Sequence, residues 1–110
     1  MKEKQFENKV FKWLAEHGIY KAGTHKQDMK VETKGWCIKF WGGGMSASGI
    51  PDILCNVNGY FVALELKGTD GRPSKLQELN IDAINKSNGI CMIVYPKDFG
   101  EMKSTIRRLL

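Results

Sequence analysis

Three charged residues, each set in an otherwise apolar and β-prone stretch, are the ones in this chain best suited to chemistry: Asp52, Glu65 and Lys67. Side chains alternate between the two faces of a strand, so Glu65 and Lys67 are expected to point the same way. The four residues before Glu65 are all apolar. A strand that is apolar on both faces and becomes charged only at its carboxyl end predicts a crevice at that end.

Asn58 and Gly59 separate this strand from the one that Asp52 precedes, and Asn-Gly between two apolar runs is typical of a tight hairpin turn. A hairpin would lay the strands side by side and bring Asp52 within reach of Glu65 and Lys67. Two carboxylates are costly to keep ionised in an apolar setting. A divalent cation offsets that cost, and a few hard oxygen ligands suit Mg²⁺. The spacing therefore predicts an active site that holds a metal ion.

Structural roles for the same residues stay open at this point. Asp52 after Pro51 has the position of a turn-capping aspartate. Glu65 and Lys67 have the spacing of a solvent-facing ion pair on an edge strand. Neither role explains why both faces of the strand are apolar immediately before the charges, so the active-site interpretation is favoured.

Pro51-Asp52, twelve intervening residues and then Glu65-Leu66-Lys67 resemble the PD-(D/E)XK motif of a nuclease superfamily that includes many restriction and repair enzymes. Within that superfamily, the Gly-Ile-Pro-Asp opening, the Glu-Leu-Lys strand and the segment from Arg72 to Gln77 resemble the VRR-NUC (virus-type replication-repair nuclease) family. The resemblance covers roughly residues 36–95. It implies one nuclease domain over residues 1–110 and a stand-alone, phage-type member of the family.

The resemblance also implies a mechanism, namely metal-assisted hydrolysis of a phosphodiester bond. Asp52 and Glu65, with the backbone carbonyl of Leu66, would hold Mg²⁺, and Mn²⁺ would be able to replace it. The metal would polarise the phosphate and lower the pKa of a bound water. Lys67 would orient that water or stabilise the charge on the pentavalent phosphate. Glu7, on the first helix, would add a further carboxylate to the metal site, although a glutamate near a helix N-terminus is also favoured by the helix dipole.

Further residues around the motif have two possible roles each. The family places a glutamine at the position of Gln77, where it faces the site, but Ser74 and Gln77 also fit a capping box at the start of a helix. Arg72 and Lys75 are candidates for contacts with DNA phosphates or for solvated charges. Lys39 is a third candidate for binding the DNA backbone, or it extends to solvent from a strand edge. The glycines at 42–44 would let the backbone approach a phosphate closely.

Hydrophobic periodicity predicts the order α-β-β-β-α-β-α: a helix over 4–17, strands around 36–41, 52–57 and 60–67, a helix over 74–88, a strand over 90–95 and a last helix from Asp98. The strand–helix–strand unit late in the chain implies a parallel pairing within a mixed sheet. We expect an α/β fold with a mixed sheet of about four strands flanked by helices, and the resemblance implies a restriction-endonuclease-like core. The residues 23–35 are expected to form a flexible loop. The apolar face predicted for the second helix consists of Leu76, Leu79, Ala83 and Ile84.

The 110 residues suffice for one modest core, and 42% hydrophobic with 26% charged residues is ordinary for a globular domain. No apolar run approaches the ~20 residues that span a bilayer, and no signal-peptide core follows the N-terminus, so a cytoplasmic, intracellular protein without membrane partners is expected. Cys37, Cys55 and Cys91 lie singly in apolar runs, which predicts free buried thiols. Of the net charge of +5, the first 39 residues hold an excess of four, which favours a polyanionic partner.

The resulting hypothesis is a Mg²⁺-dependent DNA endonuclease. The resemblance alone implies a virus or mobile-element origin, action on branched DNA such as four-way (Holliday) junctions, and a homodimer. Two alternatives of a different class are a non-catalytic nucleic-acid-binding module with the same fold and a structural partner in a replication complex. A pure binder has no reason to keep two carboxylates facing phosphates, which favours the enzyme.

Overall fold

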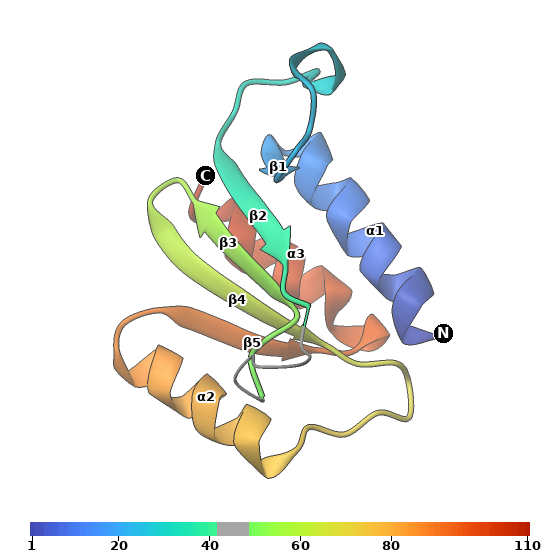
Figure 1. The fold of residues 1–110 in the computed structure, drawn as a ribbon, viewed down its shortest axis with the longest axis vertical. Coiled ribbons are helices and arrows are strands. Elements are labelled where there is room, and N and C mark those ends of the chain that lie inside the picture. Colours follow the sequence, from blue (N-terminus) through green and yellow to red (C-terminus); the bar gives the residue numbers. More distant parts are fainter. Residues whose placement is uncertain (42–48) are drawn as a thin grey trace.

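The structure is a computed structural model that describes residues 1–41 and 49–110 (Figure 1). Five strands form one mixed sheet in the order β1-β2-β3-β4-β5. The elements follow in the order α1 (Glu3–Glu16), β1 (Ile19–Lys21), the 3₁₀ turn η1 (Lys26–Asp28), β2 (Gly35–Lys39), β3 (Ile53–Val57), β4 (Tyr60–Leu66), α2 (Lys75–Lys86), β5 (Ile90–Val94), the 3₁₀ turn η2 (Pro96–Asp98) and α3 (Phe99–Arg107). The glycine-rich segment 42–44, expected to approach a phosphate, lies outside the described residues.

The predicted hairpin between β3 and β4 is confirmed. Asn58 and Gly59 both have positive φ, 51° and 93°, which is the backbone that a type I′ turn requires at its two central residues. The turn pairs the strands antiparallel, with Val57 opposite Tyr60 and Ile53 opposite Leu64. The last pairing is the important one, because it places the start of β3 beside the end of β4.

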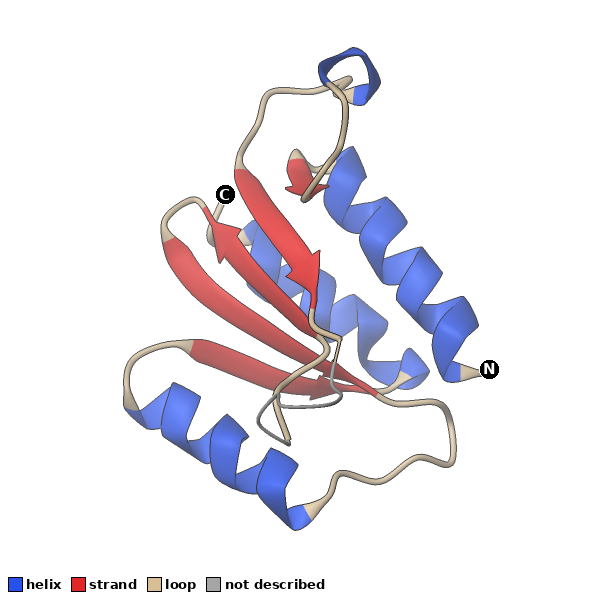
Figure 2. Ribbon diagram, viewed as in Figure 1, coloured by secondary structure: helices blue, strands red, loops and turns tan. Residues whose placement is uncertain are grey.

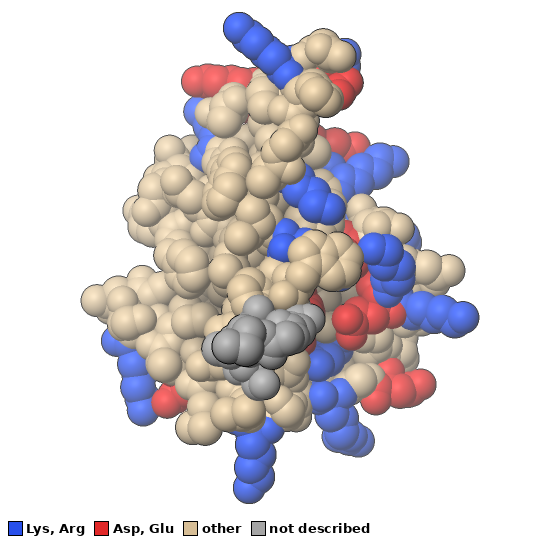
Figure 3. Space-filling model, viewed as in Figure 1, with Lys and Arg blue, Asp and Glu red and all other residues tan. Residues whose placement is uncertain are grey.

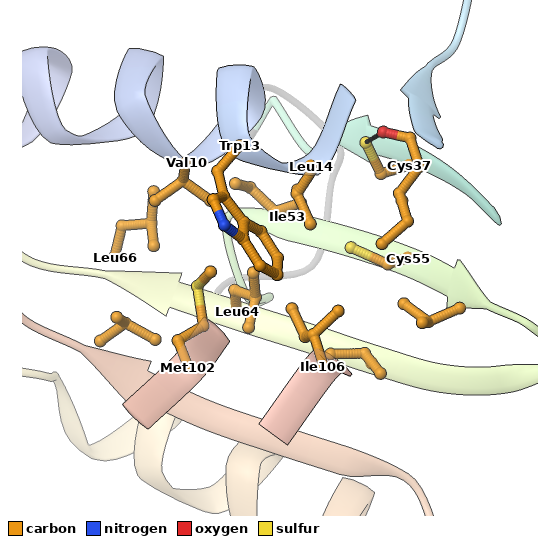
Figure 4. Packing of buried hydrophobic residues seen from close by; sticks show 14 of the residues in the cluster. Val10, Trp13, Leu14, Cys37, Ile53, Cys55, Leu64, Leu66, Met102 and Ile106 are labelled. Atoms are coloured by element: carbon orange, nitrogen blue, oxygen red, sulfur yellow. Dashed lines mark hydrogen bonds between the residues drawn. The ribbon is translucent and has the colours of Figure 1, made fainter. Parts of the chain in front are cut away.

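Helices α1 and α3 cover one face of the sheet, and α2 lies on the other (Figure 2). The core lies between the sheet and the helices α1 and α3 (Figure 4), where alternate residues of β3 and β4 meet apolar residues of both helices. The apolar residues that recur at helical spacing in α1 are all buried: Phe6, Val10, Trp13 and Leu14. The parallel pairing of β4 with β5, across the intervening α2, is also as predicted. The three cysteines are free and buried, as predicted.

The prediction of about four strands is wrong by one, because β1 is an additional strand that pairs parallel with β2. A three-residue strand is too short to show periodicity in a sequence. Gly18 makes it possible: its φ is +80°, and a Cβ there would lie 2.2 Å from the carbonyl oxygen of Glu32. Residues 23–35 contain the turn η1 and are joined to the sheet by Tyr20, whose hydroxyl donates to the carbonyl oxygen of Val31 at 2.8 Å.

The apolar face predicted for α2 is wrong at Leu76 and Leu79, which are 51% and 64% exposed, and Ala83 is exposed too. The positions that the helix turns inward are 77, 80, 81 and 84, all partly buried. Polar contacts set this rotation. Gln77 bonds to Glu65 below it, and the amide of Asn80 donates to the carbonyl oxygen of Gly49 at 2.9 Å. In the described part of the chain, no helix is long and apolar enough to cross a membrane.

The rotation of α2 predicts that its leucines contribute little to stability. We expect Leu79→Ala to change the free energy of unfolding by less than ~0.5 kcal/mol, because the side chain is already in solvent. Leu64→Ala, in the core beneath α1 and α3, should cost ~2–5 kcal/mol. Urea denaturation of both variants measures the difference, and equal losses would show that Leu79 is buried.

Candidate active site

The carboxylate of Asp52 is tied to the end of β4. Its Oδ2 accepts a hydrogen bond from the backbone N–H of Leu66 at 2.8 Å. The backbone carbonyl of Asp52 accepts from the N–H of Phe40 at 2.7 Å, which continues the pairing of β3 with β2. Asp52 is thus bonded to the residue that lies between Glu65 and Lys67, as the hairpin predicts. Its carboxylate bonds to a neighbouring strand, so it does not act as a cap of its own turn.

Glu65 is the residue on which the site is built. Its side chain is 1% exposed, although it is a carboxylate on a central strand. Oε2 accepts a hydrogen bond from the side-chain amide of Gln77 at 2.9 Å and lies 3.1 Å from the ammonium nitrogen of Lys67. Oε1 is buried and has no hydrogen-bond partner within residues 1–41 and 49–110. The alternative of a solvent-facing pair on an edge strand is therefore excluded for Glu65 and Lys67.

The unpartnered oxygen has an electrostatic consequence. The pKa of Glu65 is raised to about 7: burial is the largest cause, the nearby carboxylate of Asp52 acts in the same direction, and Lys67 opposes both. A buried charge is normally matched by enough donors or by a cation. Among the described residues, one ammonium, one side-chain amide and one backbone N–H face two carboxylates, so two negative charges meet a single positive charge. An added cation would restore the balance.

Gln77 fills both of the roles that the sequence left open. Its Oε1 accepts from the backbone N–H of Ser74 at 2.8 Å, and the hydroxyl of Ser74 accepts from the N–H of Gln77 at 3.1 Å, which completes the predicted capping box. The amide nitrogen of the same side chain donates to Glu65. The two ends of one amide therefore join the first turn of α2 to the carboxylate, and the roles do not compete.

Glu7, on the inner side of α1, is buried. Lys39 on β2 forms an ion pair with it, and Lys4 lies 3.6 Å from its other oxygen. The ammonium of Lys39 also lies 4.6 Å from the centre of the Trp41 ring. Lys39 was predicted to contact the DNA backbone, but its ammonium pairs with Glu7 and its side chain is mostly buried.

Glu3 is a carboxylate near the site that the sequence analysis missed. Partial burial raises its pKa, Asp52 is the next cause, and Lys67 and Lys39 act in the opposite direction. Its position one helical turn before Glu7 is the signal that would have found it, since residues four apart share a helix face. In the described ranges, however, no three His, Cys, Asp or Glu side chains are grouped closely enough to hold a metal ion. Glu7 and Glu3 thus border the Asp52–Glu65 pair without joining it.

The other residues predicted for the site lie around this centre. Leu66 turns its side chain into the core and presents only its backbone to Asp52. Arg72 is exposed and lines a surface hollow of about 670 Å³ together with Lys97 and residues of the connector after β4. Lys75 is exposed at the first residue of α2. Figure 3 shows acidic and basic side chains gathered beside each other on the right-hand side of the molecule, where Figure 1 places the N-terminus.

Comparison with known proteins adds nothing to this picture. No family model matches the chain, no curated protein matches it, and no solved structure matches it. The resemblance to the VRR-NUC family accordingly stays a prediction drawn from the residues of the motif.

The raised pKa of Glu65 predicts how stability depends on pH. The folded protein holds the proton of Glu65 more tightly than the unfolded chain, whose carboxyl has a pKa near 4.5. The stabilisation of the fold by this bound proton is therefore complete below about pH 4.5 and is lost as the pH rises through about 7. Glu65→Gln stays neutral, so we expect the variant to be more stable than the parent by ~1–3 kcal/mol at pH 8, with the difference shrinking toward pH 4.5. Denaturation without divalent cations across this range measures it, and a constant difference would contradict it.

Proposed function

We propose that the protein is a metal-dependent endonuclease of the PD-(D/E)XK type that hydrolyses phosphodiester bonds in DNA. One observation carries the proposal: among the described residues, the buried carboxylate of Glu65 has one oxygen without a hydrogen-bond partner, and it lies beside a second carboxylate and one lysine. This is a costly arrangement for a merely structural role, since a buried charge without compensation destabilises a fold. Strongly perturbed carboxylates at the end of a strand are typical of catalytic sites.

The donor set fits a divalent cation of the Mg²⁺ type. Asp52, Glu65 and the backbone carbonyl of Leu66 would hold it, because Mg²⁺ commonly binds one or two carboxylates and completes its coordination with water and substrate phosphate. When bound, the cation supplies Lewis acidity toward the phosphate and makes water a better nucleophile.

The remaining work falls to side chains whose positions the fold determines. Lys67 holds a compact positive charge next to Glu65, where it stabilises the negative charge that develops on the phosphate. Gln77 keeps the carboxylate of Glu65 in one orientation. The N–H of Leu66 does the same for Asp52. Exposed Arg72 and Lys75 provide contacts for neighbouring phosphates, which a chain with a net charge of +5 favours.

Asp52→Asn and Glu65→Gln should each abolish Mg²⁺-dependent cleavage of DNA. Each change removes a metal ligand, so the loss should exceed the roughly 10- to 100-fold typical of residues that merely support one. DNA binding should be equal or tighter, because a negative charge facing the phosphates disappears. Gel assays on labelled single-stranded, duplex, flapped and four-way-junction DNA measure cleavage with Mg²⁺ or Mn²⁺. Asp82→Asn, exposed on α2, is the matched control and should cleave normally. Near-normal cleavage by either site variant would refute the assignment, and DNA binding without cleavage by the parent would favour a binding module.

Gln77→Ala and Ser74→Ala separate the catalytic role of the capping box from its structural one. Both remove half of the box and should cost ~1 kcal/mol of stability. Only Gln77 touches Glu65, so only Gln77→Ala should also lower the rate, by about 10- to 100-fold. Melting temperatures and single-turnover rates of both variants provide the comparison. Equal rates for the two would leave Gln77 with a purely structural function.

For the substrate and assembly we propose a homodimer that acts on branched DNA. Resolving a four-way junction requires two symmetrically placed cuts, and a two-fold dimer provides two copies of the single Asp52–Glu65 site. We expect sedimentation to show a dimer, and binding to a junction to be tighter than to linear duplex and to weaken steeply with salt. A monomer at micromolar concentration that cuts linear duplex and junction equally would overturn this proposal and leave the nuclease assignment standing.

A further inference from the structure

The face of the sheet that carries Glu65 also carries two exposed aromatic side chains. Trp36 on β2 lies opposite Asn56 on β3, and Asn56 lies opposite Phe61 on β4. Residues paired in this way point to the same face of a sheet. Trp36 is 51% exposed and Phe61 47% exposed. The three residues form one row across the sheet, with an aromatic ring at each end.

The residue between the two rings does not cover either of them. Asn56 is exposed, and its side-chain oxygen accepts a hydrogen bond from the N–H of Gly59 at 2.8 Å, which keeps the amide against the hairpin turn. Two residues farther along β2, Ile38 lies opposite Leu54 on β3, and both are only partly buried. Figure 3 shows the surface over β2, β3 and β4 largely without charged side chains, with several Lys and Arg and fewer Asp and Glu at its margins.

This row lies on the same face of the sheet as the candidate active site. Phe61 and Glu65 are four residues apart on β4, so they share a face and lie about 13 Å apart along the strand. The residue between them, Ala63, is small and buried. Ala63 and Glu65 are themselves covered, so the row and the site are two separate regions of one face of the sheet. The nucleic acid strand itself would connect the two regions.

We propose that Trp36 and Phe61 form a stacking platform for unpaired bases of the DNA strand that enters the active site. Exposed aromatic rings on a sheet, surrounded by basic side chains, are the arrangement by which single strands are bound without dependence on sequence. The proposal rests on the proposed nuclease function for the path of the strand. It adds a binding site for single-stranded DNA and gives the protein a reason to prefer substrates with unpaired nucleotides.

Binding without cleavage tests the platform. The full-length protein in EDTA is titrated into fluorescein-labelled oligothymidylate of about 12 nucleotides, and into an oligomer of the same length with abasic sugars. Trp36→Ala and Phe61→Ala should each weaken binding to oligothymidylate by about tenfold, which is the effect of losing one stacked base. Binding to the abasic oligomer should change less than about twofold, because its phosphates are unaltered. Equal weakening for both oligomers would overturn the proposal.

Matched variants separate stacking from other roles of the rings. Tyr60→Ala, next to Phe61 and facing the opposite side of the strand, should bind oligothymidylate normally although its ring is equally exposed. Trp36→Phe should retain most of the affinity, and Trp36→Leu, which remains apolar but cannot stack, should not. Normal binding by Trp36→Leu, or a change from dimer to monomer in Trp36→Ala, would assign the surface to apolar docking and overturn the proposal.

The outcome is separable from that of the nuclease assignment. If Asp52→Asn cleaves DNA normally while Trp36→Ala weakens binding to oligothymidylate alone, the platform is confirmed and the catalytic site is wrong. If Asp52→Asn is inactive and Trp36→Ala binds both oligomers normally, the catalytic site is confirmed and the platform is refuted.

Discussion

The buried carboxylate of Glu65 is the constraint that organises this end of the protein. A carboxylate with almost no exposure, on a strand in the interior of the sheet, needs donors from whatever elements lie near it. Lys67 directly follows the end of the same strand, two residues after Glu65. Gln77 comes from α2, and the same amide closes the capping box that starts that helix. The first turn of α2 is thus joined to this carboxylate through Gln77.

The two buried carboxylates differ in how the described residues compensate their charge. Glu7 is equally buried, but Lys39 pairs with it directly and Lys4 lies near. Glu65 has Lys67 on one oxygen and nothing among the described residues on the other, with Asp52 adding further negative charge. The contrast between two buried carboxylates in one small domain is informative. Glu7 has the partners of a structural residue, and Glu65 has the deficit of a site that awaits a cation or a proton.

The hairpin determines which residues can take part. Because Asn58 and Gly59 form a two-residue turn, the start of β3 is held beside the end of β4, and Asp52 meets the backbone of Leu66. A shift of register by one residue would turn Glu65 to the core face and Leu64 outward. The same register aligns Trp36, Asn56 and Phe61 across three strands, so the exposed aromatic row and the catalytic candidates depend on one turn.

Local sequence determined those features that depend on neighbouring residues alone. The Asn-Gly turn, the inward face of α1, the capping box at Ser74 and the shared face of Glu65 and Lys67 all follow from backbone preferences and periodicity within a few residues. The association of Asp52 with the end of β4 follows from the turn by simple pairing. For that reason the centre of the candidate site could be predicted before the fold was known.

Only the tertiary structure decided features that depend on contacts between distant segments. The strand β1 forms because β2 offers it a paired edge, which a three-residue stretch cannot signal. The rotation of α2 follows from Gln77 and Asn80 bonding to residues elsewhere in the chain, and these polar contacts outweigh the burial of Leu76 and Leu79. The pairing of Lys39 with Glu7 and the exposure of Trp36 and Phe61 likewise depend on which helix covers which part of the sheet. Periodicity records that a residue is apolar or charged, and the packing of distant elements determines what it meets.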